Sequence, residues 1–94
     1  MMKKIVSNTK VQQNKEIDAS DLNGDKVMMN LEKGMYFALN GVGSRIWDII
    51  EEEKSVDHIV DVLTSEYKVN REQCEDSVIT FLEGLESDEL ITVL

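Results

Sequence analysis

The fold is decided by the stretch Lys26-Val27-Met28-Met29-Asn30-Leu31-Glu32-Lys33-Gly34-Met35-Tyr36-Phe37-Ala38-Leu39. Apolar residues alternate on both sides of Glu32-Lys33-Gly34, and a three-residue loop containing Gly between alternating segments is typical of a β-hairpin. Pairing Leu31 with Met35 aligns the apolar positions of the two strands. This register puts six residues on one apolar face: Val27, Met29, Leu31, Met35, Phe37 and Leu39.

Upstream of the hairpin, Asn23-Gly24-Asp25 is a good tight-turn sequence. It predicts a preceding strand that ends near Leu22 and completes a three-stranded meander. The start of that strand is not defined by the pattern. Residues 1–15 are either poorly ordered or part of the first strand.

After residue 40 the apolar period changes from two to three and four, which indicates helices. Asn40, Ser55 and Asn70 are the predicted N-caps, and Asn70 with Gln73 forms a capping box that opens a third helix to about Glu86. The predicted apolar stripes are Val42, Ile46, Ile49 and Ile50; then Val56, Ile59, Val60, Leu63 and Tyr67; then Cys74, Val78, Phe81, Leu82 and Leu85. Residues 90–94 form a short apolar tail that covers the core or adds a brief strand. The prediction is a single α+β domain over residues 1–94, winged-helix-like, with a three-stranded antiparallel sheet followed by three helices.

Charge and composition exclude several classes of function. The chain has 94 residues and a net charge of −9. Residues 41–94 carry four basic against fourteen acidic residues, a balance of −10, so this half should repel nucleic acid, whose binding depends on Lys and Arg.

The longest apolar run is Met35–Leu39, far below the roughly 20 residues of a membrane-spanning helix. One cysteine allows no internal disulfide, and we expect a cytoplasmic protein.

Residues suited to catalysis or metal binding are few. His58 is the only histidine and falls off the apolar stripe, so it is expected to be a solvated surface residue. Cys74 lies on the predicted core stripe, where a small buried hydrophobe is the ordinary role. The sequence therefore predicts no catalytic residue, no metal site and no cofactor.

The last predicted strand of the meander is the feature that indicates a binding partner. Met35–Leu39 contains no charge, Pro or Gly, and a meander leaves this strand at a sheet edge. Natural proteins usually protect such edges, because their open N–H and C=O groups recruit further strands. The edge is either covered by residues 90–94 or the N-terminus, paired in a homodimer, or used for β-augmentation by an extended peptide.

A family resemblance favours the last of these. Residues 24–40 and 42–47 resemble the PqqD-like pattern, in which "g..vlldl..G.yy.LN" is followed by "vg.riW". The likeness extends over about residues 20–92. PqqD-like proteins are the leader-recognition elements of ribosomally made, post-translationally modified peptides (RiPPs).

The resemblance implies a winged-helix-like peptide chaperone without catalytic activity. It would bind a precursor's leader peptide along the third strand, in a cleft closed by the third helix, and deliver it to a modifying enzyme. Free-standing members of this size resemble the recognition subunit of lasso-peptide biosynthesis, whose partner is a leader-cleaving cysteine protease. Others resemble the carrier for the pyrroloquinoline quinone precursor or for radical-SAM peptide maturases. The alternative is a winged-helix DNA-binding regulator, which the acidic third helix disfavours.

The resemblance also implies a set of peptide-binding residues. The third strand would offer its backbone, and the third helix the residues beside its apolar stripe. On the helix, Asp76 and Glu83 suit a basic leader residue, whereas Ile79 either floors an apolar pocket or widens the stripe. The full set is Met35, Tyr36, Phe37, Ala38, Gln73, Asp76, Ile79, Thr80 and Glu83.

Overall fold

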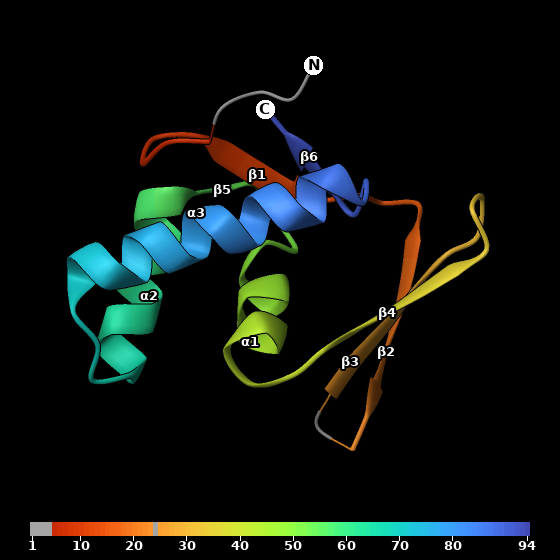
Figure 1. The fold of residues 1–94 in the computed structure, drawn as a ribbon, viewed down its shortest axis with the longest axis horizontal. Coiled ribbons are helices and arrows are strands. Elements are labelled where there is room, and N and C mark those ends of the chain that lie inside the picture. Colours follow the sequence, from red (N-terminus) through yellow and green to blue (C-terminus); the bar gives the residue numbers. More distant parts are fainter. Residues whose placement is uncertain (1–4, 24) are drawn as a thin grey trace.

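The computed structural model describes residues 5–23 and 25–94, which form two small antiparallel sheets and three helices (Figure 1). The elements in chain order are β1 (Lys10–Gln13), β2 (Ile17–Leu22), β3 (Asp25–Asn30), β4 (Met35–Leu39), α1 (Gly41–Ile49), β5 (Lys54–Ser55), α2 (Val56–Glu66), α3 (Arg71–Ser87) and β6 (Ile91–Val93). We call β2-β3-β4 the meander sheet and β5-β1-β6 the terminal sheet. The predicted meander and the three predicted helices are confirmed, and so is the α+β class.

The hairpin register differs from the predicted one by one residue. Asn30, rather than Leu31, pairs with Met35, so the loop has four residues. Asn30 closes this loop twice: its carbonyl oxygen accepts a hydrogen bond from Gly34 N at 2.8 Å, and its Oδ1 accepts one from Lys33 N at 3.1 Å. Gly34 adopts φ +65°, which glycine allows without strain. These polar contacts set the loop length, and an apolar pattern carries no information about them.

The shift divides the predicted apolar face. Phe37 and Leu39 do pack against the core, and their inward-facing neighbour on β3 is the fully buried Met28. The β3 half of the prediction was wrong. Val27 and Met29 lie on the opposite face, paired with Ala38 and Tyr36, while Leu31 and Met35 are largely exposed near the hairpin tip.

The terminal sheet joins three segments that are far apart in the chain. β1 pairs with β5 on one side and with β6 on the other, both antiparallel. The apolar tail therefore adds a strand, as one of the two predictions had it. Residues 1–15 were predicted to be either poorly ordered or part of the first strand. They contribute β1, which belongs to this sheet and not to the meander. Residues 1–4 lie outside the described part of the chain. Val11 of β1 is fully buried.

The three helices begin at the three predicted N-cap residues and bury one core. The Ser55 and Asn70 side chains accept hydrogen bonds from His58 N and Gln73 N, each at 3.1 Å. Asn40 is the N-cap of α1 without a side-chain hydrogen bond. Trp47 and Ile50 are among the largest fully enclosed side chains. In the described part of the chain, no helix is both long and apolar enough to span a membrane.

The meander sheet projects from the helices and is joined to them by two ion pairs (Figure 1). Lys26 Nζ of β3 lies 3.0 Å from Asp48 of α1, and Lys33 Nζ at the hairpin tip lies 2.6 Å from Glu89. Glu89 follows α3 with φ +60°. Leu90 N donates to Leu85 O and Glu89 N to Glu86 O, both at 2.9 Å, which is a Schellman C-cap. The hairpin is thus held beside the C-terminal end of α3.

Candidate functional site

The outer edge of β4 carries backbone groups that point away from the sheet. The Asn30 carbonyl faces β4, since it accepts from Gly34 inside the hairpin. Antiparallel strands alternate hydrogen-bonded and non-hydrogen-bonded pairs, so Phe37 bonds toward Met28 whereas the N–H and C=O of Tyr36 and Ala38 face outward. Among residues 5–23 and 25–94, no strand pairs with this edge. The tail, which could have covered it, is instead paired with β1.

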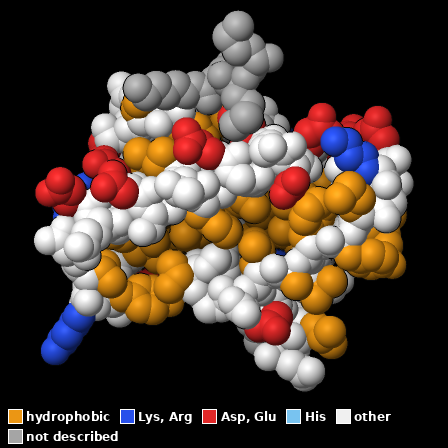
Figure 2. All heavy atoms as spheres, in the orientation of Figure 1, with side chains coloured by type: hydrophobic (Ala, Val, Ile, Leu, Met, Phe, Trp, Pro, Cys, Tyr) orange, Lys and Arg blue, Asp and Glu red, His pale blue; other side chains and the backbone are white. Residues whose placement is uncertain are grey.

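A cavity of about 560 Å³ lies near this edge, between α1, the α2–α3 connection and the first half of α3. Its walls are mostly apolar. The lining residues are Val42, Gly43, Ile46, Leu63, Lys68, Val69, Asn70, Gln73, Cys74, Ser77, Val78 and Phe81. Figure 2 shows the apolar surface as a band beneath α3 that continues toward the meander sheet. The cavity can therefore accept an apolar side chain from a ligand lying along α3.

Phe81 connects the cavity to the β4 edge. A Cβ placed on Gly43 would lie 3.3 Å from the Cε1 and Cζ atoms of the Phe81 ring and 3.8 Å from Cδ2 of Leu39. The C-terminal end of β4, the start of α1 and the middle of α3 thus meet at one point. Phe81 and Ser77 also line a shallow hollow with Asp76 and Thr80, which adjoins the cavity at these two shared residues. We call the cavity, this hollow and the adjoining edge of β4 together the groove.

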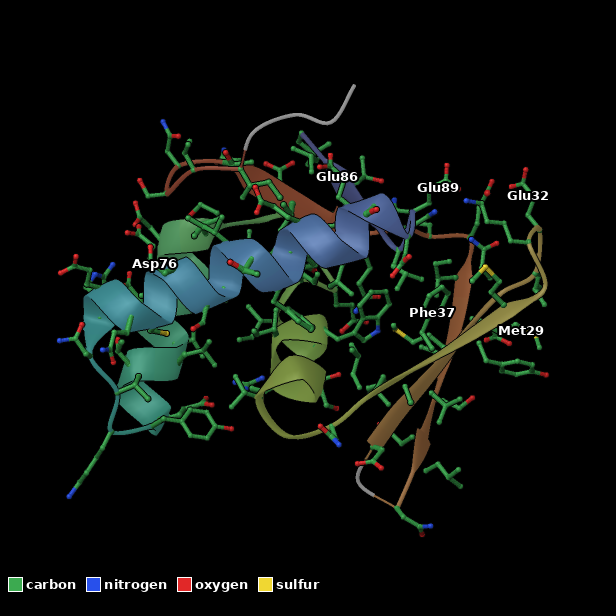
Figure 3. The ribbon with its side chains drawn as sticks, in the orientation of Figure 1. Met29, Glu32, Phe37, Asp76, Glu86 and Glu89 are labelled. Atoms are coloured by element: carbon green, nitrogen blue, oxygen red, sulfur yellow. The ribbon has the colours of Figure 1, made fainter. Side chains whose placement is uncertain are left out.

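The four predicted β4 residues take up two different positions. Phe37 is half-buried and points toward the helices, whereas Met29 on the neighbouring strand points to the other side of the sheet (Figure 3). Tyr36, which shares the outward face with Met29, is 70% exposed, and Ala38 is exposed as well. Met35 is 48% exposed. The outer edge of β4 therefore has no strand partner among the described residues, and of these four residues Phe37 is the one whose side chain packs against the core.

On α3 the structure brings three of the five predicted residues to the groove. Gln73 lines the cavity, and Asp76 and Thr80 line the shallow hollow. Ile79 comes two residues after Ser77, about 200° around the helix, and packs against the core on the far side. Glu83 is half-buried and lines neither space.

Sequence reasoning missed most of the cavity wall. Val42, Cys74 and Phe81 were predicted as core residues because they fall on the apolar stripes. In the structure Val42 is 43% exposed, and Cys74 and Phe81 are half-buried at the margin of the core. The signal was present as a stripe on the third helix that is wider than its buried part, Val78, Leu82 and Leu85.

Local electrostatics give the site no reactive group. Burial raises the pKa of the Cys74 thiol, and the nearby Arg71 only partly opposes this, so the reactive thiolate is disfavoured. No group of three potential metal ligands occurs in the described residues. Arg71, the only basic residue of α3, pairs with Asp61 at 2.6 Å. The lining of the groove is therefore mainly apolar, and its one thiol is held in the protonated form.

A second hollow, of about 580 Å³, lies at the other end of α3 between the hairpin and β6. It is acidic, with Glu16, Glu32, Glu86 and Glu89 in its lining. Oε1 of Glu86 is buried without a hydrogen-bond partner among the described residues. Figure 3 shows Glu32 on the hairpin and Glu86 and Glu89 at the end of α3.

Comparison with known proteins identifies relatives of this arrangement. The family model for coenzyme PQQ synthesis protein D (PqqD) matches residues 25–91. A search of the curated proteins finds no match. A solved structure described as TbiB1 in complex with the TbiA(beta) leader peptide is similar with a TM-score of 0.80 and 35% identity, covering 85% of this chain and 93% of that one. A structure described as lasso peptide synthetase B1 complexed with the leader peptide shares the fold, with a TM-score of 0.79 and 22% identity, covering 87% of this chain and 96% of that one.

Proposed function

This chain belongs to the PqqD family, and from that premise we propose that it binds the leader segment of a ribosomally made precursor peptide as a fourth strand on β4. The observation that carries the proposal is an open strand edge lying beside an apolar cavity. TbiB1, at 35% identity, was solved with a leader peptide, which supports the same class of ligand for this chain.

The backbone of β4 would supply the first part of the affinity. Tyr36 and Ala38 each offer one N–H and one C=O to an added strand, up to four hydrogen bonds in all. Each such bond contributes about 0.5–1.5 kcal/mol net. These hydrogen bonds involve only the backbone of the bound leader, so they contribute affinity without selecting its sequence.

The side chains of the guest strand would supply the selectivity. Directly opposed residues share a face of the sheet, so the guest residues opposite Phe37 and Leu39 point toward α3. Those two positions are two residues apart. The one opposite Leu39 lies nearest Phe81 and the cavity, where an apolar side chain is favoured. We therefore expect apolar residues at alternate positions of the leader.

The bound leader would then be presented to a separate protein. We propose a modifying enzyme or, as the resemblance to lasso-peptide recognition subunits implies, a leader-cleaving cysteine protease as that partner. The chain itself would act as one recognition domain without catalysis, in the cytoplasm where its single cysteine stays reduced. The DNA-binding alternative receives no support, since Arg71, the one cation of α3, is held by Asp61.

Titration of labelled peptides tests the proposal. The probes are the fluorescein-labelled TbiA(beta) leader peptide and peptides selected on this protein from a random display library, followed by fluorescence anisotropy. We expect binding in the micromolar range or tighter, with slowed hydrogen exchange of the Tyr36 and Ala38 amides. If neither kind of probe binds, or if protection appears only outside β4 and α3, the proposal is wrong.

A further inference from the structure

Gly84 lies on the side of α3 that borders the groove. It follows Ser77 by seven residues, about 700°, which is within roughly 20° of two full turns, so the two residues share one face of the helix. Ser77 lines both the cavity and the shallow hollow. Gly84 is exposed and lies about one turn beyond Phe81. The ring of Phe81 and the side chain of Leu39 both lie next to Gly43.

Neither backbone geometry nor packing among the described residues accounts for a glycine at this position. Gly84 is helical, with three further helical residues after it, and glycine is the least favourable residue in a helix apart from proline. Its backbone does not adopt the positive φ that would require glycine. A Cβ on Gly84 would meet no atom of the described residues within 4 Å, so close packing does not require glycine either. The remaining explanation for a glycine is the unfilled space beside Gly84, which a larger side chain would occupy.

We propose that Gly84 is a specificity-determining residue, whose missing side chain leaves room for a large inward-pointing residue of the guest strand. The inference rests on the proposed function. The guest residue opposite Phe37 points toward α3, on the hairpin side of the position beside Phe81. The guest class is therefore a peptide with a large apolar or aromatic side chain at this position, two residues from the one that occupies the cavity.

Substitution of Gly84 separates binding from folding because the two effects have opposite signs. Gly84→Ala and Gly84→Leu should raise the melting temperature by roughly 2–6 °C through better helix propensity. Both should weaken the peptide that binds the unaltered protein in the titration above, with Leu causing a loss of roughly 5- to 100-fold through overpacking. Ser65→Ala is the matched control: it also improves propensity at an exposed helical position, but on α2, and should leave affinity unchanged.

Shortening the guest provides a second readout. Each bulky residue of the bound strand is replaced by Ala in turn, and one replacement should bind Gly84→Leu at least as well as it binds the unaltered protein. Affinity of Gly84→Leu within twofold of the unaltered protein, or a loss that no shortened peptide restores, would overturn the inference while leaving strand addition in place. If the unaltered protein binds no probe, the proposed function fails and the inference with it.

Discussion

The two sheets of this protein differ in how much of their surface the molecule covers. In the terminal sheet, Val11, Ile91 and Val93 are all buried. In the meander sheet only Met28 and Asn30 are buried, and the whole of β2 apart from Ile17 is exposed. Its β4 edge also has no strand partner among the described residues and lies near the apolar cavity. A domain this small can leave a sheet exposed because its stability is concentrated elsewhere.

The difference predicts that changes in one sheet affect folding and changes in the other affect binding. The terminal sheet joins residues separated by more than 70 positions, so losing it disconnects the ends of the chain from the core. The meander sheet is a local structure held by the half-buried Phe37 and Leu39 and by the Lys26–Asp48 and Lys33–Glu89 ion pairs. Local openings of low free energy are expected in such weakly packed regions.

The largest effect is expected from one carboxylate placed in each sheet in turn. Val11→Asp puts an unpaired charge at a fully buried position, which should lower the free energy of unfolding by at least about 3 kcal/mol, a large part of a small domain's stability. Ser20→Asp, in the exposed middle of β2, should change it by less than about 1 kcal/mol. Urea denaturation followed by circular dichroism measures both. Equal losses would remove the proposed division between the sheets.

Proline along β4 gives the next largest effect and resolves the edge to single residues. Tyr36→Pro removes a donor that faces outward, so leader affinity should fall about tenfold while the melting temperature changes little. Phe37→Pro removes a donor that faces β3 and disturbs a side chain packed on the core, so it should mainly destabilise the fold. Peptide titration and thermal melts on both variants decide. The reverse ranking would mean that the inward and outward positions of β4 have been exchanged.

The same contrast explains what sequence reasoning could find. The meander, the three helices and the open edge come from local patterns and caps within residues 17–87, and those were predictable. β1 was not, because Gln12 and Gln13 hide its alternation and its partners are Lys54–Ser55 and Ile91–Val93. The predicted pairing register of the hairpin was wrong because the loop length depends on the hydrogen bond that Lys33 N donates to the Asn30 side chain, which an apolar pattern does not indicate. The wall of the groove was missed because Phe81 and Cys74 are apolar, and apolarity alone does not distinguish a core residue from a cavity lining.

Gly43→Ala tests whether the bound leader contacts Phe81, which lies where the core borders the groove. The new Cβ would lie 3.3 Å from the Phe81 ring, so the ring must shift by a few tenths of an ångström toward the groove. Leader affinity should fall about threefold by a smaller version of the overpacking effect, while stability changes by less than about 1 kcal/mol because Ala favours the helix. Anisotropy and urea denaturation report the two quantities. Unchanged affinity would show that the guest does not contact Phe81.

Glu89→Gly tests how the meander sheet is attached. Glu89 occupies the left-handed C′ position of a Schellman cap, where glycine is strongly preferred. The substitution should stabilise the protein by about 0.5–1 kcal/mol, since it relieves backbone strain and removes only an exposed ion pair with Lys33. Faster hydrogen exchange in β3 and β4 should accompany the gain. Exchange rates that stay the same would show that the hairpin is held without this ion pair.

The smallest effect concerns charge along the groove. Asp76 lines the shallow hollow, so a leader with Lys or Arg on the α3 side should bind two- to fivefold more weakly when salt rises from about 0.05 to 0.5 M, as the screening length falls from about 14 Å to about 4 Å. Asp76→Asn should reduce this salt dependence. Glu51→Gln, an exposed carboxylate outside the groove with the same change in net charge, should not. A general effect of the protein's acidity would make the two variants behave alike, whereas a local one separates them. Affinity that is constant across the salt range would leave strand addition and apolar packing on the meander edge as the only sources of binding.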